Sequence, residues 1–268
     1  MFDVASVERR LPVAGLGRPL LFEARVGSTQ SLAGALAAAG AAHGTLVVAD
    51  EQTEGRGRHG RRWLTPAGSA LAFSLILRPG LSPGEARPRE LAAWNLVGAV
   101  AVSEALEGLG AQPQIKWPND VLLGGRKVAG ELLEISWMDQ RLDSLVLGIG
   151  ANVHAGSVPP ASEVDFPTTC VEEALGRRPS REDLLVGIVQ QIGQACDPLD
   201  PARIVAKVNQ RLAFLGRPVR VTTGTSATEG HLVAIGDEGE IVIRESGGRQ
   251  VSLAGGDPHL RPLDDEAE

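Results

Sequence analysis

The sequence predicts an α+β fold with one large mixed domain and a small C-terminal all-β module. The chain has 268 residues, more than a minimal module needs and fewer than two full-sized domains need. Up to about residue 215, apolar segments with helical spacing alternate with short strand-like runs. After Gly216 only short strands separated by glycine turns follow. We therefore expect two domains, over residues 1–215 and 216–268.

Apolar periodicity and turn residues place the elements of the large domain. In chain order we expect a helix that runs through residues 31–36 and stops near Gly40, strands over 45–50 and 69–77, and a helix over 90–109. Strands over 115–117, 121–123, 127–136 and 142–153 follow, and then helices over 181–196 and 202–215. Ser28 can cap the first helix, because a serine hydroxyl accepts from the unpaired N–H groups of a first turn. Gly124-Gly125 predicts a tight hairpin turn. Residues 1–27 are short and mixed.

The C-terminal module should contain short antiparallel strands. We expect them over 219–221, 231–235, 240–244 and 250–253. Asp237-Glu238-Gly239 and Gly247-Gly248 would supply the turns, because glycine adopts the positive φ that tight hairpins need.

Composition limits the class of protein. The chain is 43% hydrophobic and 22% charged, as in a soluble globular protein, and its net charge is -7. An acidic chain does not cover nucleic acid with its whole surface, so any polyanion site must be a local basic patch. Cys170 and Cys196 show neither metal-ligand spacing nor a disulfide framework. With no secretory signal and no apolar run of bilayer length, we expect a cytoplasmic protein without a membrane partner.

The most informative segment is the arginine–glycine loop, residues 52–62 (QTEGRGRHGRR). Arginine forks bind carboxylate and phosphate oxygens two at a time, and glycines let backbone N–H groups turn toward an anion. Trp63, directly after the loop, can offer a flat face to a purine base. The alternative is a solvated basic turn. The loop also matches G-x-G-x-x-G, but no helix follows it, so we reject a dinucleotide-binding fingerprint.

Two further segments place charged groups at strand ends. In Lys116-Trp117-Pro118-Asn119-Asp120, the proline stops the strand, so that the amide and the carboxylate project from its end. These groups can hold Mg²⁺ together with phosphate oxygens, or can form a plain Asn-Asp turn. Lys127 can neutralise an α-phosphate as it becomes five-coordinate, or serve only solubility at a hairpin end.

The strand that ends near Asn152 contains two glycines, Gly148 and Gly150. Glycine inside a strand marks the close approach of a ligand or of another backbone. Asn152 is the polar group at the end of this strand. No two histidines have metal-ligand spacing, so we predict no zinc site.

Taken together, these segments resemble the biotin–protein ligase family. The matching stretches are Ser28-Thr29-Gln30, Gln52 through Trp63, Lys116 through Asp120, Lys127 through Gly130, and Gly148 through Val153. They occur in the family's order and approximate spacing, and the loop combined with Lys-Trp-Pro-Asn-Asp is highly specific. Gln30 stands where an asparagine is commoner, and His154 replaces a residue that is often asparagine.

The resemblance implies a catalytic domain similar to class II aminoacyl-tRNA synthetases, a mixed β-sheet flanked by helices, followed by an SH3-like β-barrel. It implies an ATP- and Mg²⁺-dependent ligase that forms biotinyl-5′-AMP. Biotin would then pass to a lysine of a biotin carboxyl carrier protein, from acetyl-CoA carboxylase or a related carboxylase. Because 27 residues precede Ser28, we expect the monofunctional type without a DNA-binding domain, as a monomer or weak homodimer.

The resemblance also assigns roles to residues. Biotin would be held by Ser28, Thr29, Gln30, Gln52, Gly55, Arg56, Gly57, Arg58 and Lys127. ATP would face Arg58, Arg61, Trp63, Asn119, Asp120 and Asn152, with Trp63 beside the adenine. The expected catalytic residues are Lys127, Arg58 and Asp120. Asp120 is also the expected Mg²⁺ ligand and a candidate base for the acceptor lysine.

Two other functions stay open. A lipoate or octanoate transfer enzyme would share a related fold, but it is expected to lack the arginine–glycine loop. A nucleic-acid or nucleotide-binding regulator could use the arginine patch and the C-terminal module. The acidic net charge and the 3% aromatic content disfavour that second alternative.

Overall fold

The computed structural model describes residues 2–12, 15–81, 85–139, 141–254 and 258–263. Its larger part is a seven-stranded mixed sheet in the order β1-β2-β3-β7-β6-β5-β4. Its strands are β1 Leu20–Val26, β2 Leu46–Gln52, β3 Ala70–Leu77, β4 Pro113–Lys116, β5 Asp120–Leu123, β6 Arg126–Met138 and β7 Arg141–Asn152. β1 and β2 run parallel, and the other neighbouring strands of this sheet run antiparallel.

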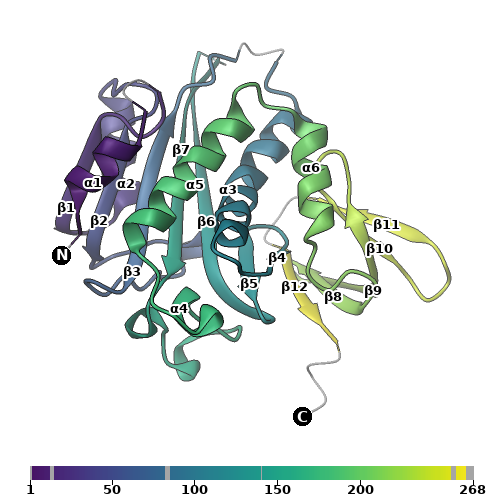
Figure 1. The fold of residues 1–268 in the computed structure, drawn as a ribbon. Helices are drawn as coiled ribbons and strands as arrows, with labels where there is room; N and C mark the ends of the chain where they lie inside the picture. Colours follow the sequence, from purple (N-terminus) through teal and green to yellow (C-terminus); the bar gives the residue numbers. More distant parts are fainter. Residues whose placement is uncertain (1, 13–14, 82–84, 140, 255–257, 264–268) are drawn as a thin grey trace.

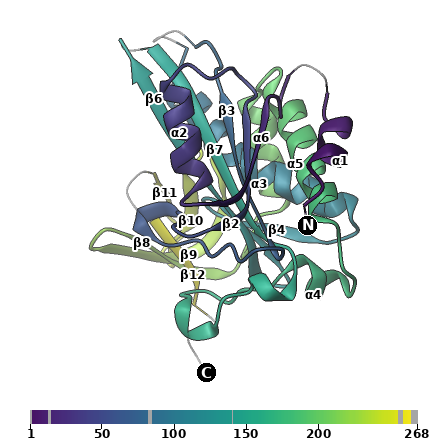
Figure 2. The same cartoon turned by 90° about the vertical axis from the view of Figure 1, so that its left-hand side faces the viewer.

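Helices cover both faces of this sheet (Figures 1 and 2). One face carries α1 Val4–Arg10, α3 Pro88–Gly108, α5 Arg181–Cys196 and α6 Pro201–Gln210, and the other carries α2 Thr29–Ala38. The short helix α4 (Val171–Leu175) and two 3-10 turns, Ala155–Ser157 and Ala161–Glu163, follow β7. None of the described helices combines the length and the apolarity needed to cross a membrane.

The central strand β3 explains why the sequence folds in layers. All eight of its residues are buried, because β3 lies between β2 and β7 and is covered by helices on both faces. A strand buried on both faces is a continuous apolar run rather than an alternating one, as in its sequence ALAFSLIL. The long helix α3 packs against both α5 and β6, and places its apolar residues in the same core.

The C-terminal module is a five-stranded antiparallel sheet in the order β11-β10-β9-β8-β12. Its strands are β8 Pro218–Thr223, β9 Ser226–Ile235, β10 Ile241–Arg244, β11 Gln250–Leu253 and β12 Pro258–Pro262. β11 and β12 form its two edges among the described residues, so a closed barrel is not shown. The indole Nε1 of Trp117, directly after β4, donates to the Gly239 carbonyl at 2.8 Å and so connects the two sheets.

Most of the predicted elements are confirmed within a few residues. Ser28 caps α2, its hydroxyl accepting from the N–H of Ser31 at 3.4 Å. Gly124 and Gly125 form the predicted hairpin turn with φ of 56° and 74°.

The predicted position for the end of the last helix was wrong. α6 ends at Gln210 rather than near residue 215. The chain then pairs with β4: the N–H of Ile115 donates to Arg211, and the N–H of Ala213 donates to Ile115. Phe214 takes a positive φ of 64°, which a helix cannot accommodate. The sequence analysis also missed α1, β1, α4 and β12.

Candidate active site

A cavity of about 430 Å³ gathers the predicted residues from distant parts of the chain. Its lining includes Ser28, Thr29, Gln30, Gln52, Arg56, Gly57, Arg58, Arg61, Trp63, Asn119, Asp120, Lys127 and Asn152. Gly55 is the one predicted site residue outside this lining. It lies at the base of the arginine–glycine loop, where a Cβ would come within 2.2 Å of the Trp63 carbonyl oxygen. The backbone therefore requires glycine there.

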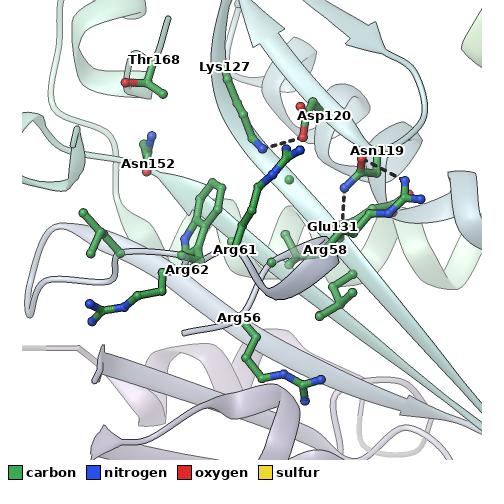
Figure 3. A pocket seen from close by; sticks show the side chains of 18 of the residues that line it. Arg56, Arg58, Arg61, Arg62, Asn119, Asp120, Lys127, Glu131, Asn152 and Thr168 are labelled. Carbon is green, nitrogen blue, oxygen red and sulfur yellow. Dashed lines mark hydrogen bonds and ion pairs between the residues drawn. The ribbon is translucent and has the colours of Figure 1, made fainter. Parts of the chain in front are cut away.

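The arginine–glycine loop folds back on itself as a short hairpin. The N–H of Trp63 donates to the Gly55 carbonyl at 2.8 Å, and the N–H of Gly57 donates to the Arg61 carbonyl at 2.8 Å. Between them the 3-10 turn Arg58–Gly60 reverses the chain. The four arginines consequently leave the loop in different directions (Figure 3).

The sequence analysis predicts that the four arginines of the loop bind an anion together, but in the structure each guanidinium group has a different partner. Arg56 pairs with Glu134, Arg58 with the side chain of Asn119, Arg61 with His259, and Arg62 with the Thr53 carbonyl. Figure 3 shows Arg58 and Arg61 directed toward Lys127, Asp120 and Asn119, whereas Arg56 and Arg62 point elsewhere. Two of the four guanidinium groups are therefore available to an anion near Lys127.

Asp120 lies between two lysines. Its Oδ1 is 2.6 Å from Lys127 Nζ, and its Oδ2 is 3.6 Å from Lys116 Nζ. Burial acts to raise the pKa of Asp120, but the two ammonium groups lower that pKa below its usual value. Burial lowers the pKa of Lys116 to about 8, although Asp120 opposes this shift. The cluster thus has one carboxylate held ionised by two amines.

Trp63 forms a flat wall of the cavity. Its indole ring lies on the backbone of Gly150, where a Cβ would come within 2.4 Å of the ring. Lys127 Nζ is 5.4 Å from the centroid of the same ring. The indole Nε1 is buried without a hydrogen-bond partner among the described residues. An aromatic face and an ammonium group therefore meet at one point of the cavity wall.

The opposite end of the cavity is polar and buried. The backbone N–H of Thr29 donates to Gln52 Oε1 at 2.8 Å, and the hydroxyl oxygens of Thr29 and Ser74 lie within hydrogen-bonding distance of each other, at 3.0 Å. Gln52 Nε2 donates to Thr65 Oγ1 at 2.9 Å, which fixes the orientation of the amide. This end offers both donors and acceptors to a polar ligand group.

Sequence reasoning missed several lining residues. The ring of Phe166 has Lys116 Nζ at 5.0 Å and the Arg261 guanidinium at 5.3 Å from its centroid. Lys116 could have been predicted, because it belongs to the Lys-Trp-Pro-Asn-Asp segment. His259 and Arg261 could not have been predicted from local sequence, because only the tertiary fold brings β12 to the cavity. Asn152 is buried, and its Nδ2 donates to the Thr169 carbonyl at 3.1 Å.

Glu131 is a buried carboxyl beside Arg58 and Asn119. Its Oε2 accepts from the backbone N–H of Ala99 in α3 at 2.9 Å, and its Oε1 has no partner among the described residues. A Cβ at Gly98 would lie 1.9 Å from Glu131 Oε2, so glycine makes room for the carboxyl. Burial raises the pKa of Glu131 well above its usual value, although the Ala99 N–H and the Arg58 charge act to lower it.

We expect Glu131→Gln to remove a pH dependence of stability. Because the pKa is raised in the folded state, folded protein keeps a proton that unfolded protein has lost above its ordinary carboxyl pKa. The free energy of unfolding should therefore fall with rising pH in this window, by up to about 1.4 kcal/mol per pH unit. The variant should show a flatter profile in urea unfolding between about pH 5 and 8. Glu229→Gln, at an exposed carboxylate, should follow the unmodified protein, and a parallel Glu131→Gln profile would contradict the prediction.

Comparison with known proteins gives consistent matches. The model of the biotin/lipoate A/B protein ligase family matches residues 23–152. The bifunctional ligase/repressor BirA of Bacillus spizizenii is 39% identical over 178 residues, 66% of this chain and 52% of that protein. The chain thus spans about half the length of this relative, and the same holds for BirA of Bacillus subtilis.

Other relatives match over nearly their whole length. The biotin–[acetyl-CoA-carboxylase] ligase of Paracoccus denitrificans is 36% identical over 238 residues, 85% of this chain and 95% of that protein. A solved structure of the biotin protein ligase from Aquifex aeolicus, in complex with biotin and ATP, superposes with a TM-score of 0.76. It is 31% identical and covers 91% of this chain and 99% of its own.

Proposed function

The chain belongs to the biotin–protein ligase family, and we propose on that premise that it activates biotin with ATP and transfers it to a protein lysine. The main support for this proposal is that one cavity combines polar side chains with cationic side chains and an aromatic ring. Relatives named biotin–[acetyl-CoA-carboxylase] ligase support a carboxyl carrier protein as the acceptor. The five-stranded C-terminal sheet is compatible with an SH3-like module, and the mixed sheet with a class II synthetase-like domain.

The polar end of the cavity favours biotin over lipoate. A ureido ring has two N–H donors and one carbonyl acceptor, which the side chains of Ser28, Thr29 and Gln52 can match. A dithiolane ring has none of these groups, so it could not form hydrogen bonds with these side chains, which pair with other protein groups when no ligand is bound. A hydrogen bond contributes a net stabilisation of about 0.5–1.5 kcal/mol, so the bonds that the ureido ring can form would favour biotin over lipoate.

The cationic end serves the first reaction. A biotin carboxylate oxygen attacks the α-phosphorus of ATP, a new O–P bond forms, and the bond to pyrophosphate breaks. Both reactants are anions, so their approach is unfavourable unless cations are already in place. Lys127, Arg58 and Arg61 would supply those charges, and the Trp63 ring would orient the adenine.

In the second reaction the acceptor amine attacks the activated carbonyl, AMP leaves, and the nitrogen gives up a proton. Asp120 is a poor acceptor for that proton, because two ammonium groups contact it and its pKa is lowered. We propose instead that Asp120 holds Lys127 in place.

Magnesium fits the described residues poorly. The two oxygens of Asp120 already face Lys127 and Lys116. We therefore derive no step through a protein-held ion.

The deciding experiment is biotin-dependent exchange of labelled pyrophosphate into ATP. We expect exchange with biotin and little with lipoate or octanoate. Transfer is then followed on a biotin carboxyl carrier domain, with a variant lacking the acceptor lysine as control. Exchange with lipoate alone would overturn the substrate assignment, and salt-sensitive binding of nucleic acid without any exchange would favour the regulator.

A further inference from the structure

Arg56 differs from the loop arginines that face Lys127. Its Nη2 lies 2.5 Å from Glu134 Oε1, and its Nη1 lies 3.5 Å from the hydroxyl of Ser31. Figure 3 shows its guanidinium directed away from Lys127 and Asp120. The positive charge of Arg56 is therefore already neutralised by a carboxylate of the protein itself.

Glu134 makes a second contact with its other oxygen. Gln30 Nε2 donates to Glu134 Oε2 at 3.0 Å, and also to the Val146 carbonyl at 3.0 Å. Ser74 donates to Gln30 Oε1 at 3.0 Å. These contacts satisfy both amide hydrogens and the amide oxygen of Gln30, whose side chain is almost completely buried, at 3% exposure. Glu134 is thus the link between the buried polar end of the cavity and the arginine–glycine loop.

The backbone makes this link stiff. β6 is paired with β7 through Glu134, opposite Val146. A Cβ at Gly148 would come within 2.3 Å of Gln30 Oε1, so the strand lies close against the amide. Gln30 itself is in the first turn of α2, next to Thr29. A shift of the loop at Arg56 would therefore act on groups that contact the ligand.

We infer that Glu134 is a positioning residue that fixes the loop against the biotin-binding end of the cavity, and that Arg56 acts through Glu134 rather than by binding a substrate carboxylate. The assignment of the ligand rests on the proposed function. Removing the Glu134 carboxylate leaves one amide hydrogen of Gln30 without its acceptor and frees Arg56. The arginine–glycine loop then loses the ion pair that connects it to β6.

A double-mutant cycle separates the two possible roles of Arg56. Arg56→Ala and Glu134→Ala should each raise the KM for biotin about fivefold, in line with a partly exposed ion pair, with kcat within about twofold. The double variant should be no worse than Glu134→Ala alone, because Glu134→Ala already removes the ion pair that Arg56→Ala removes. If the increases in KM of the two single variants multiplied in the double variant, or if Glu134→Ala lowered the KM for biotin, Arg56 would bind the substrate directly. Either result would overturn the inference.

A second measurement needs no substrate. Trypsin should cut the loop of ligand-free Glu134→Ala about fivefold faster than that of the unmodified protein, because the pair restrains the loop. Glu229→Gln removes the charge of a carboxylate that pairs with Arg220 on the C-terminal module, and should leave the cleavage rate unchanged. Equal cleavage of the Glu134→Ala loop overturns the inference, whereas absence of biotin-dependent exchange in the unmodified protein overturns only the proposed function.

Discussion

Lys127→Met is expected to lower the rate of biotin-dependent pyrophosphate exchange by about 10²–10³-fold, the usual cost of removing one preorganised charge from a reacting centre. Methionine keeps most of the length and apolar volume of the side chain and removes the ammonium group. That group lies 2.6 Å from Asp120 and 5.4 Å from the centroid of the Trp63 ring. Without it, carboxylate and phosphate would meet with one cation fewer, and the loss should appear in kcat.

Lys207→Met is the matched control for this variant. Lys207 has similar exposure, 18% against 22%, and pairs with Glu104 at 2.6 Å, outside the cavity lining. It should exchange pyrophosphate at nearly the unmodified rate. Urea unfolding of both variants separates lost chemistry from lost stability, because Asp120 keeps Lys116 as a partner in Lys127→Met. Exchange within tenfold of the unmodified rate would rule out Lys127 as the principal cation.

Gly150→Ala is expected to raise the KM for ATP by about 10–100-fold while changing the KM for biotin far less. The new Cβ would lie 2.4 Å from Nε1 and Cε2 of Trp63. β7 cannot move away, because Gly150 pairs with Ala72 on one side and Gly130 on the other. The indole must therefore shift, and a displaced ring loses a stacking contact worth about 1–3 kcal/mol.

Gly156→Ala tests whether any added methyl group nearby has this effect. A Cβ there would meet Ser69 at 3.4 Å, an ordinary contact, so both KM values should stay near those of the unmodified protein. A Gly150→Ala variant whose KM for ATP is unchanged would show that Trp63 does not orient the nucleotide.

Local sequence signals located the elements that carry most of the site. The hydroxyl of Ser28 caps a helix wherever the chain continues into a helical pattern, and Gly124-Gly125 form a hairpin turn without tertiary help. These features depend on a few neighbouring residues, so they can be predicted from the sequence. The loop and the Lys-Trp-Pro-Asn-Asp segment were recognised for the same reason.

Contacts between distant segments could not be predicted in this way. The presence of Gly98 within an apolar helix has no local explanation until the Glu131 carboxyl is seen against it. Arg56 was grouped with its neighbours because they are alike in sequence, and only the fold shows its separate partner on β6. The end of α6 was misplaced because its competitor was a backbone pairing with β4, far away along the chain.

The contribution of β12 to the cavity has a consequence for synthesis of the protein. His259 and Arg261 leave the ribosome after every other lining residue. A nascent chain that ends before β12 already contains all seven strands of the large sheet, together with Lys127 and Asp120, but lacks the β12 residues that line the cavity. Assembly of the complete cavity therefore depends on β12.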